Sequence, residues 1–462
     1  MERECNANNR DLQERWQMMI TLLRKVARRN GWICMLSLIQ VMLACSRCQN
    51  DAETWVAGLQ LSEDTIPYKE VFGELEQEAL VICNDVDLKG KVCCLPEGML
   101  MKFCGGVIKN GALVGNGNKI EITGKCFERV RISGTWDVPE ISTSMFKDLN
   151  YDNSLKDVVA LANPAIANRI VIEEGDYQVS AQRSGETCLA IGNNTKLLVN
   201  GTIRLTPNVF QSYHIIEING ENIAVSGKGI IAGDKHTHVG NAGEWGMGIM
   251  IRHASNVRLS GLTIKDCWGD CVYVGGNSKK VLIENCHLDH GRRQGISITS
   301  ADGVTVKDCT ISNVGGTAPE YAIDIEPNRG NSVNHIVIDN VVAKDCKGGI
   351  GANKNAEDAW IGNVTIRNCT ISAVRKAMAN LNTCDTVIIE NNDMAQELGK
   401  RGIVCRGNNH VVVVNNSVRY NSGAVLRLWE LARKIKGKEE VLPIDVDNCG
   451  TTVIAGNQEH RL

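Results

Sequence analysis

The sequence predicts an all-β chain built as a parallel β-solenoid, on the evidence of a repeat and of the composition. One short strand motif recurs through the second half, as "LTIKDC", "VLIENCHL", "VTVKDCTI" and "VTIRNCTI". The steps between aligned positions include 23 residues from Cys286 to Cys309 and 24 residues from Asn392 to Asn416. The 45 glycines and only 8 prolines suit many short strands joined by tight turns. Repeats of this length with β-branched strands are typical of stacked solenoid coils.

One column of the repeat is predicted to form an inward ladder along the stack. Cysteine is a small and often buried hydrophobe, and asparagine can hydrogen-bond to its counterpart in the next coil. We therefore expect the cysteines of this column to be buried free thiols, and neither a disulfide framework nor a zinc site. The column consists of Leu262, Cys286, Cys309, Val341, Cys369, Asn392, Asn416 and Asn457.

A second strand column precedes each repeat and carries the candidate chemistry. It contains "GIMI" (248–251), "CVYV" (271–274), "GISI" (295–298) and "AIDI" (322–325). In a strand alternate side chains share a face, so Asp324 and Glu326 face outward if Ile323 and Ile325 fill the core. Stacking predicts two outward columns: Met250, Tyr273, Ser297, Asp324 and Gly351 in one, and Arg252, Gly275, Thr299, Glu326 and Asn353 in the other.

The parts upstream of the repeats are predicted to differ from it. "LKDVVALANP", Leu155–Pro164, has the pattern of a short amphipathic helix, which we expect to cap the first coil of the solenoid. Residues 67–149 carry further short strands and glycine turns and form a smaller β-rich region, and 46–66 form a linker. Residues 150–462 then form the solenoid domain.

The N-terminus predicts an export segment over residues 1–45. A basic cluster is followed by the almost wholly apolar run Trp32–Cys45, which is too short to span a bilayer and matches a signal-peptide core. The tetrad ending at Cys45 resembles a bacterial lipobox, which implies lipidation of Cys45 and a protein anchored to the outer membrane of the cell envelope. Met18, Met19 and Met35 are alternative starts. The net charge of -3 gives no basic surface for nucleic acid.

Several motifs resemble one superfamily. "GKGIIAGD", Gly227–Asp234, resembles the turn before the catalytic coils of polygalacturonase-like hydrolases, and "WGDCVYVGG", Trp268–Gly276, is similar to the acidic strand start of that family. Cys271 stands where that family has a second aspartate, and its Gly-His-Gly motif is absent unless "DHGRR" replaces it. "YAIDIE" resembles the Tyr-x-x-Asp-x-His strand of mannuronan C5-epimerases, with Glu326 in place of the histidine.

The whole pattern, including "GEWGMGI" and "RRQGISI", also resembles lipoprotein β-helix proteins of gut Bacteroidetes. Residues 150–462 are thus identified as similar to the pectin-lyase-like superfamily. The resemblance implies a single-stranded right-handed parallel β-helix.

The outward columns and the loops entering them define a candidate polysaccharide site. Asp324, Glu326 and Asp270 are the candidate catalytic residues, because paired carboxylates roughly 6.6 Å apart on one strand can act as acid and base in glycoside hydrolysis. The candidate substrate-binding residues are Glu244, Trp245, Trp268, Tyr273, His290, Arg292, Arg293 and Tyr321.

Two other functions remain open. In a lyase or epimerase acting on a uronate glycan, Arg292 or Arg293 would neutralise the substrate carboxylate, and Tyr321 or His290 would move the proton. In a non-catalytic, tailspike-like adhesin the same groove would only bind sugar. No cofactor is required, although Ca²⁺ at the carboxylates is an alternative, as is a metal at His236, His238 and Asp234, where a plain polar loop is favoured.

Overall fold

The computed structural model describes residues 65–461 apart from 74–78, 123, 374–375, 397–400, 421–433 and 435–441. Thr65–Leu462 form one compact unit, and the predicted boundary between residues 149 and 150 falls inside it. The predicted export segment with Cys45, and all but the last two residues of the predicted linker, lie outside the described residues. Among the described residues no helix has the length and apolar character needed to cross a membrane.

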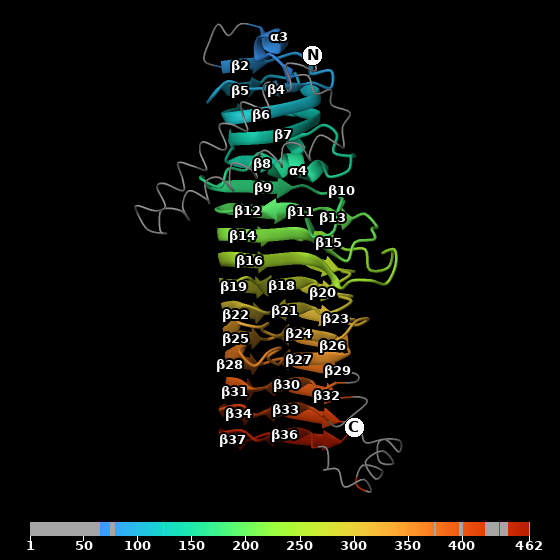
Figure 1. Cartoon of the computed structure of the whole chain (residues 1–462), viewed down its shortest axis with the longest axis vertical. Coiled ribbons are helices and arrows are strands. Elements are labelled where there is room, and N and C mark those ends of the chain that lie inside the picture. Colours follow the sequence, from blue (N-terminus) through green and yellow to red (C-terminus); the bar gives the residue numbers. More distant parts are fainter. Residues whose placement is uncertain are drawn as a thin grey trace, which may run out of the picture. The chain divides into compact units, whose positions relative to one another are not determined.

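The described strands form three sheets in which every pairing is parallel (Figure 1). The first sheet contains β1 (Thr65–Ile66), β2 (Ala79–Ile82), β3 (Val86–Asp87), β4 (Val92–Cys94), β5 (Leu100–Phe103), β6 (Ile108–Glu121) and β7 (Phe127–Asp137). In the second sheet most strands begin directly after a residue of the ladder column. This sheet contains β10 (Asp176–Val179), β13 (Thr202–Leu205), β15 (Ile230–Ala232), β17 (Thr263–Lys265), β20 (His287–Asp289), β23 (Thr310–Ser312), β26 (Val342–Cys346), β29 (Thr370–Ala373), β32 (Asp393–Gln396), β35 (Ser417–Tyr420) and β38 (Gln458–Arg461).

The largest sheet supplies two strands to most coils. Its first half contains β8 (Glu140–Ser142), β9 (Asn168–Ile172), β11 (Glu186–Ile191), β12 (Thr195–Val199), β14 (Ser212–Ser226), β16 (Trp245–Ser260), β18 (Val272–Gly275), β19 (Ser278–Glu284), β21 (Ile296–Ile298) and β22 (Ala301–Lys307). Its second half contains β24 (Tyr321–Ile325), β25 (Ser332–Asp339), β27 (Gly348–Ala352), β28 (Trp360–Arg367), β30 (Ala379–Asn382), β31 (Cys384–Glu390), β33 (Ile403–Arg406), β34 (His410–Val414), β36 (Ile444–Asp447) and β37 (Thr451–Ala455). The predicted parallel β-helix is confirmed.

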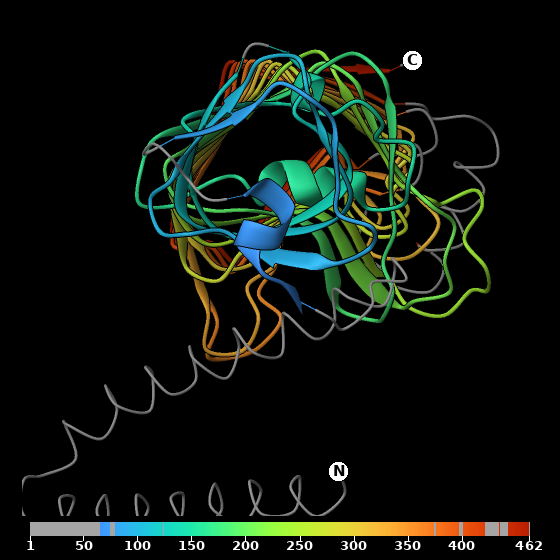
Figure 2. The same cartoon turned by 90° about the horizontal axis from the view of Figure 1, so that it is seen from above.

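The helices are few and short. The described ones are α3 (Tyr68–Phe72), the 3-10 turn Thr143–Met145 and α4 (Ser154–Val159). The helix expected over Leu155–Pro164 is therefore α4, which ends five residues earlier than predicted. It does not close the end of the described stack, because it packs between β7 on one side and β10 and β11 on the other. Seen end-on, the helix lies within the outline of the coils (Figure 2).

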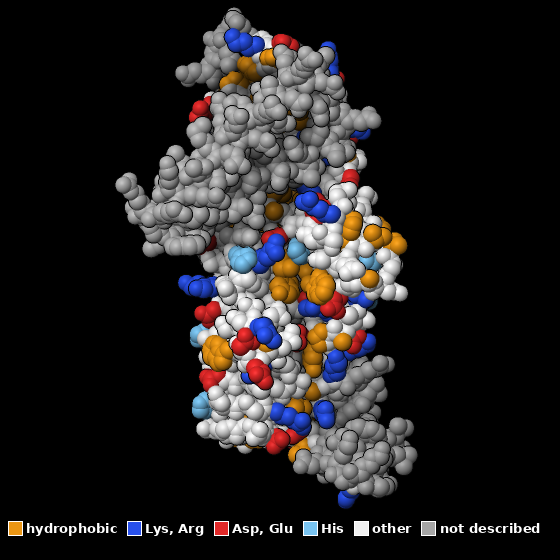
Figure 3. Space-filling view, in the orientation of Figure 1, with side chains coloured by type: hydrophobic (Ala, Val, Ile, Leu, Met, Phe, Trp, Pro, Cys, Tyr) orange, Lys and Arg blue, Asp and Glu red, His pale blue; other side chains and the backbone are white. Residues whose placement is uncertain are grey.

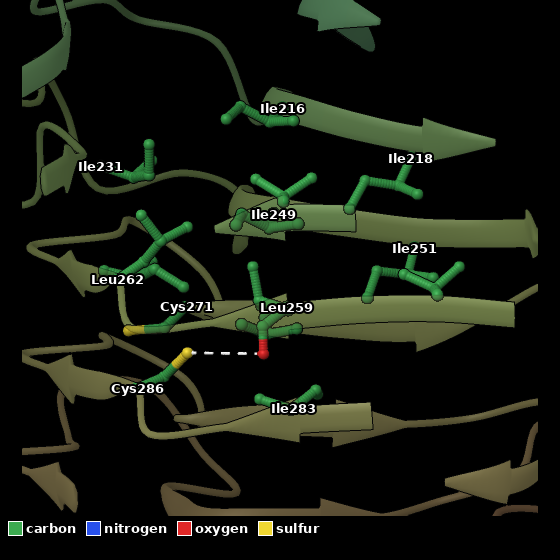
Figure 4. Close-up of a cluster of buried hydrophobic side chains, with 14 of the residues drawn as sticks. Ile216, Ile218, Ile231, Ile249, Ile251, Leu259, Leu262, Cys271, Ile283 and Cys286 are labelled. Atoms are coloured by element: carbon green, nitrogen blue, oxygen red, sulfur yellow. Dashed lines mark hydrogen bonds between the residues drawn. The ribbon is translucent and has the colours of Figure 1, made fainter. Parts of the chain in front are cut away.

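The ladder column is confirmed by the register of the strands that follow it. The chain pairs Thr263 with His287, then Thr310, Val342, Thr370, Asp393, Ser417 and Gln458 in successive coils, so the residues directly before them are aligned. Its cysteines are buried and unpaired by disulfides, and Figure 4 shows Cys286 among isoleucines and leucines, with its thiol directed at the carbonyl of Leu259. The described disulfide, Cys83–Cys104, lies outside the column.

Asparagines continue the same ladder toward the C-terminus. The side-chain oxygen of Asn416 accepts from the Nδ2 (2.9 Å) and backbone N–H (3.0 Å) of Asn392, and Asn457 does the same for Asn416. Just before the column the chain turns through left-handed backbone, at Asn285 (φ 52°), Asp308 (φ 54°) and Asn391 (φ 56°). Asn and Asp tolerate this conformation best among residues other than glycine, which explains the repeated "EN", "KD" and "NN" of the motif.

Candidate functional site

The candidate site lies on the outer face of the strand column β16, β18, β21, β24 and β27. The register pairs Met250 with Tyr273, Tyr273 with Ser297, Ser297 with Asp324, and Asp324 with Gly351. Arg252 pairs with Gly275 in the adjacent column, and the backbone N–H of Glu326 donates to Ile298 O at 3.0 Å. Both predicted outward columns are therefore present in the structure.

This face is much less open than the sequence suggests. Asp324 is 3% exposed and Ser297 2%. Aromatic rings fill part of the groove predicted on this face. A Cβ added at Gly348 would lie 2.6 Å from the ring of Tyr321, and one at Gly275 would lie 2.7 Å from the ring of Tyr273. The glycines thus make room for tyrosine side chains.

Asp324 sits in a polar but dehydrated setting. Its Oδ2 accepts from Gln294 Nε2 at 2.8 Å, and Gln294 Oε1 in turn accepts from the backbone N–H of Tyr321 at 2.7 Å. Burial, and then the negative charge of Glu326, raise the pKa of Asp324 to about 8, against the opposing charge of Arg293. At neutral pH most of this carboxyl group is therefore protonated.

Glu326 is half-buried beside it. Burial raises its pKa, the charges of Asp270 and Glu244 raise it further, and Arg293 opposes them. No hydrogen bond to the Glu326 carboxylate is found within the described part of the chain. When two neighbouring carboxyl groups have different surroundings, one can act as a general acid and the other as a general base.

Asp270 forms a buried ion pair with Arg293. The fully buried carboxylate accepts from Nε at 2.8 Å and from Nη2 at 3.0 Å, and Nη2 also donates to Ser297 Oγ at 3.3 Å. Burial raises the pKa of Asp270, and the guanidinium opposes that effect. This bidentate pair fixes a positive charge close to Asp324 and Glu326. Asp270 therefore positions Arg293, whose positive charge acts to lower the pKa of both Asp324 and Glu326.

Trp268, Arg292 and His290, which were predicted to bind substrate, are engaged with partners within the chain. Trp268 is buried in a stack, with the ring of His238 3.9 Å from it and the guanidinium of Arg292 3.7 Å from its ring. Arg292 also donates to Gly243 O at 2.9 Å. His290 bonds to Asp289 at 2.7 Å. These side chains hold the 234–244 loop and its neighbours together.

The remaining predicted binding residues have distinct surroundings. Trp245 is 47% exposed at the start of β16. The hydroxyl of Tyr273 accepts from Thr299 Oγ1 at 2.7 Å. Tyr321 is 8% exposed and its hydroxyl accepts from Asn380 Nδ2 at 3.2 Å. Glu244 acts electrostatically on Asp270, Glu326 and Arg293.

The alternative metal site at the two loop histidines is not assembled. His238 Nδ1 lies 2.8 Å from Asp234, which also accepts from the Tyr213 hydroxyl, whereas His236 bonds to Asp266 at 3.1 Å. Within the described ranges no three metal-ligating side chains come together in a way that could hold an ion.

Sequence reasoning missed Gln294, Asn380, Asn382 and Lys376. Gln294 contacts Asp324 directly, and Lys376 lies 5.1 Å from the centroid of the Tyr321 ring. The spacing in "MANLN" repeats the alternation of "AIDIE" and was an available signal for the two asparagines. Lys376 and Gln294 lie in loops, where no periodicity points to them.

One family model describes the architecture seen here. Residues 208–363 match the family model described as a right handed beta helix region. The chain is 32% identical over 181 residues to the uncharacterized protein YclG of Bacillus subtilis (strain 168). This alignment covers 33% of this chain and 31% of that protein. It is 30% identical over 162 residues to the SPbeta prophage-derived uncharacterized protein YorA of the same organism, covering 30% and 28%.

The chain thus spans about a third of the length of these two relatives. Among solved structures, an exopolygalacturonase from Thermotoga maritima matches with a TM-score of 0.41 and 14% identity, over 62% of this chain and 87% of that chain. The parallel pairing of the described strands and the matched family model together identify the described fold as a right-handed parallel β-helix.

Proposed function

We propose that the protein cleaves glycosidic bonds of a polysaccharide on the outer face of β24. The observation that carries this proposal is the pair Asp324 and Glu326 on one strand, in which burial and the negative charge of Glu326 raise the pKa of Asp324 to about 8. A carboxyl group that is still protonated at neutral pH can act as a general acid, as inverting and retaining glycosidases require.

In this mechanism Asp324 protonates the glycosidic oxygen as the bond to the anomeric carbon breaks. Glu326 in its ionised form removes a proton from the attacking water. Alternate positions on a strand are roughly 6.6 Å apart, near the low end of the roughly 6.5–9.5 Å typical of inverting enzymes. Arg293, held by Asp270, favours the ionised form of Glu326. After the reaction Glu326 holds the proton and Asp324 the negative charge, and exchange with water restores both.

A uronate lyase or epimerase is less well supported by the same geometry. Such chemistry needs a cation for the substrate carboxylate and a free base, whereas Arg293 is paired with Asp270, Arg292 is stacked on Trp268, and the Tyr321 hydroxyl is engaged by Asn380.

Export and lipidation at Cys45 remain predictions, as does the absence of a required cofactor.

The test uses the full chain on a panel of plant, mucin and uronate-rich glycans. New reducing ends and the ultraviolet absorbance of unsaturated uronate are read in parallel. Asp324→Asn and Glu326→Gln are compared with Asp302→Asn, an exposed carboxylate on β22 that bonds to His335. We expect reducing ends without absorbance, reduced at least 100-fold in both site variants and unchanged in the control.

Other outcomes separate the competing functions. Absorbance that survives Glu326→Gln would move the assignment to a lyase. Glycan binding without either signal, unaffected by Asp324→Asn, would make the protein an adhesin.

A further inference from the structure

We infer that the substrate is an uncharged polysaccharide, bound on the C-terminal side of the carboxyl pair by a row of three asparagines. This inference rests on the proposed function, since it names the substrate class of the same site. It departs from the expectation, raised by two adjacent arginines in the sequence, of an anionic glycan.

Three arginines near the site are already engaged within the chain. Arg293 makes its two bonds to buried Asp270, and Arg252 makes two to Glu217, at 2.7 and 3.0 Å. Arg292 is stacked on Trp268 and donates to a loop carbonyl. A uronate carboxylate could recruit one of these guanidinium groups only by competing with a partner that is already in place. Removing the partner of a buried charge is strongly unfavourable.

The nearby lysines are engaged as well. Lys347 forms an ion pair with Glu320, and Lys376 donates to the carbonyl of Pro319 while lying over the Tyr321 ring. Meanwhile Glu326, Glu244 and Asp270 act together on the one guanidinium of Arg293. A further carboxylate on each sugar would therefore be repelled more than attracted.

Neutral amides continue the two outward columns beyond the carboxyl pair. Asp324 pairs with Gly351, and Gly351 pairs with Asn380. The backbone N–H of Asn353 donates to Ile325 O at 3.0 Å, which places Asn353 in the coil after Glu326. Asn382 follows one coil later and its Nδ2 donates to Asn353 Oδ1 at 2.5 Å. The row therefore occupies the two coils that follow the carboxyl pair, and its far end lies about 10 Å from that pair at the spacing of neighbouring strands.

The amides retain hydrogen-bonding capacity for a ligand. Nδ2 of Asn382 also donates to Asn380 Oδ1 at 3.1 Å, whereas Oδ1 of Asn382 is buried and accepts no hydrogen bond. A buried acceptor without a donor is costly, so a turn of the Asn382 amide that brings this oxygen to a ligand hydroxyl would be favourable. Primary amides both donate and accept, as sugar hydroxyls do, and they carry no charge. The row thus matches the hydroxyl edge of a neutral sugar chain.

The experiment compares glycans that differ mainly in their charge. Fully methyl-esterified and unesterified polygalacturonate, and β-1,4-mannan and polymannuronate, are offered to the full chain alongside neutral and anionic members of a wider array. Binding is measured with Asp324→Asn, and reducing ends with the wild type. We expect a neutral glycan to bind at least 10-fold more tightly than any anionic one, and to be the one that is cut.

Variants test the asparagine row on the glycan that binds most tightly. Asn382→Ala and Asn353→Ala should each raise KM about 10-fold and leave kcat within twofold. Asn409→Ala, an exposed asparagine that bonds to Asp385, should change neither. An unchanged KM in both row variants would overturn the assignment of these residues.

The outcomes also distinguish the two proposals. Preferred cleavage of an anionic glycan, abolished by Asp324→Asn, would overturn the neutral substrate and leave the hydrolase standing. Preferred binding of a neutral glycan that is never cut would overturn the hydrolase and support the neutral ligand. Failure to bind or cut any member of the array would overturn both.

Discussion

Replacing Asp324 by asparagine should change how the stability of the protein depends on pH. The carboxyl group is almost fully buried, and its pKa is raised from 3.8 to about 8. Asparagine has nearly the same shape, can still accept from Gln294, and carries no titratable proton.

The sign and size of the effect follow from proton binding. Because the folded state holds this proton to higher pH than the unfolded chain, the contribution of Asp324 to stability is fully present below about pH 4. It is lost as pH rises through the folded pKa near 8. A difference of about four pH units corresponds to roughly 6 kcal/mol, at about 1.4 kcal/mol per unit. Relative to wild type, the asparagine variant should therefore gain stability progressively between pH 4 and pH 8.

The assay is urea unfolding followed by tryptophan fluorescence, at intervals from pH 4.5 to pH 8.5. Asp302→Asn serves as the matched control, since that carboxylate is 55% exposed. The difference between wild type and Asp324→Asn should grow steadily with pH, whereas the control difference should stay flat. Parallel curves for Asp324→Asn and wild type would show that Asp324 is ionised in the fold at neutral pH, and would remove the basis for its role as an acid.

Three further substitutions test the fold and the site. Arg293→Met leaves the buried charge of Asp270 uncompensated and should lower the free energy of unfolding by about 3–5 kcal/mol, measured by urea unfolding at pH 7. A decrease of less than about 1 kcal/mol would contradict the pairing. Asn416→Ala removes side-chain bonds to Asn392 in the preceding coil and to Asn457 in the following one, and should cost about 1–3 kcal/mol in the same measurement; no loss would speak against the ladder. Gly349→Ala would bring a Cβ within 2.0 Å of Met378 O and should cost more than about 4 kcal/mol, seen as loss of soluble protein; normal yield would refute the close approach.

The ladder and the outward columns could be predicted because each depends on nearest neighbours. Alternation along a strand decides which face a residue takes, and the repeat step decides which residue it lies above. Cys286, Asn416 and Asp324 therefore occupy the positions expected from the sequence. The left-handed turns before the column are local too, since Asn and Asp favour them.

Loop side chains could not be placed in this way. Arg292 and Arg293 are adjacent in the sequence, yet one stacks on Trp268 and the other pairs with Asp270. No periodicity decides between these partners, because the 234–244 loop supplies carbonyls and a histidine that compete for the same groups. The position of α4 between coils also depends on packing against β7.

By itself the sequence determined the coil, the inward ladder and the side of the sheet on which Asp324 and Glu326 lie, because these follow from local alternation and a regular step. Only the tertiary structure decided that the face is nearly closed, that Tyr321 covers two glycines of β27, and that three nearby arginines are occupied. Those features arise where residues from different coils and loops compete for one space and one charge. Such competition is settled by packing and desolvation.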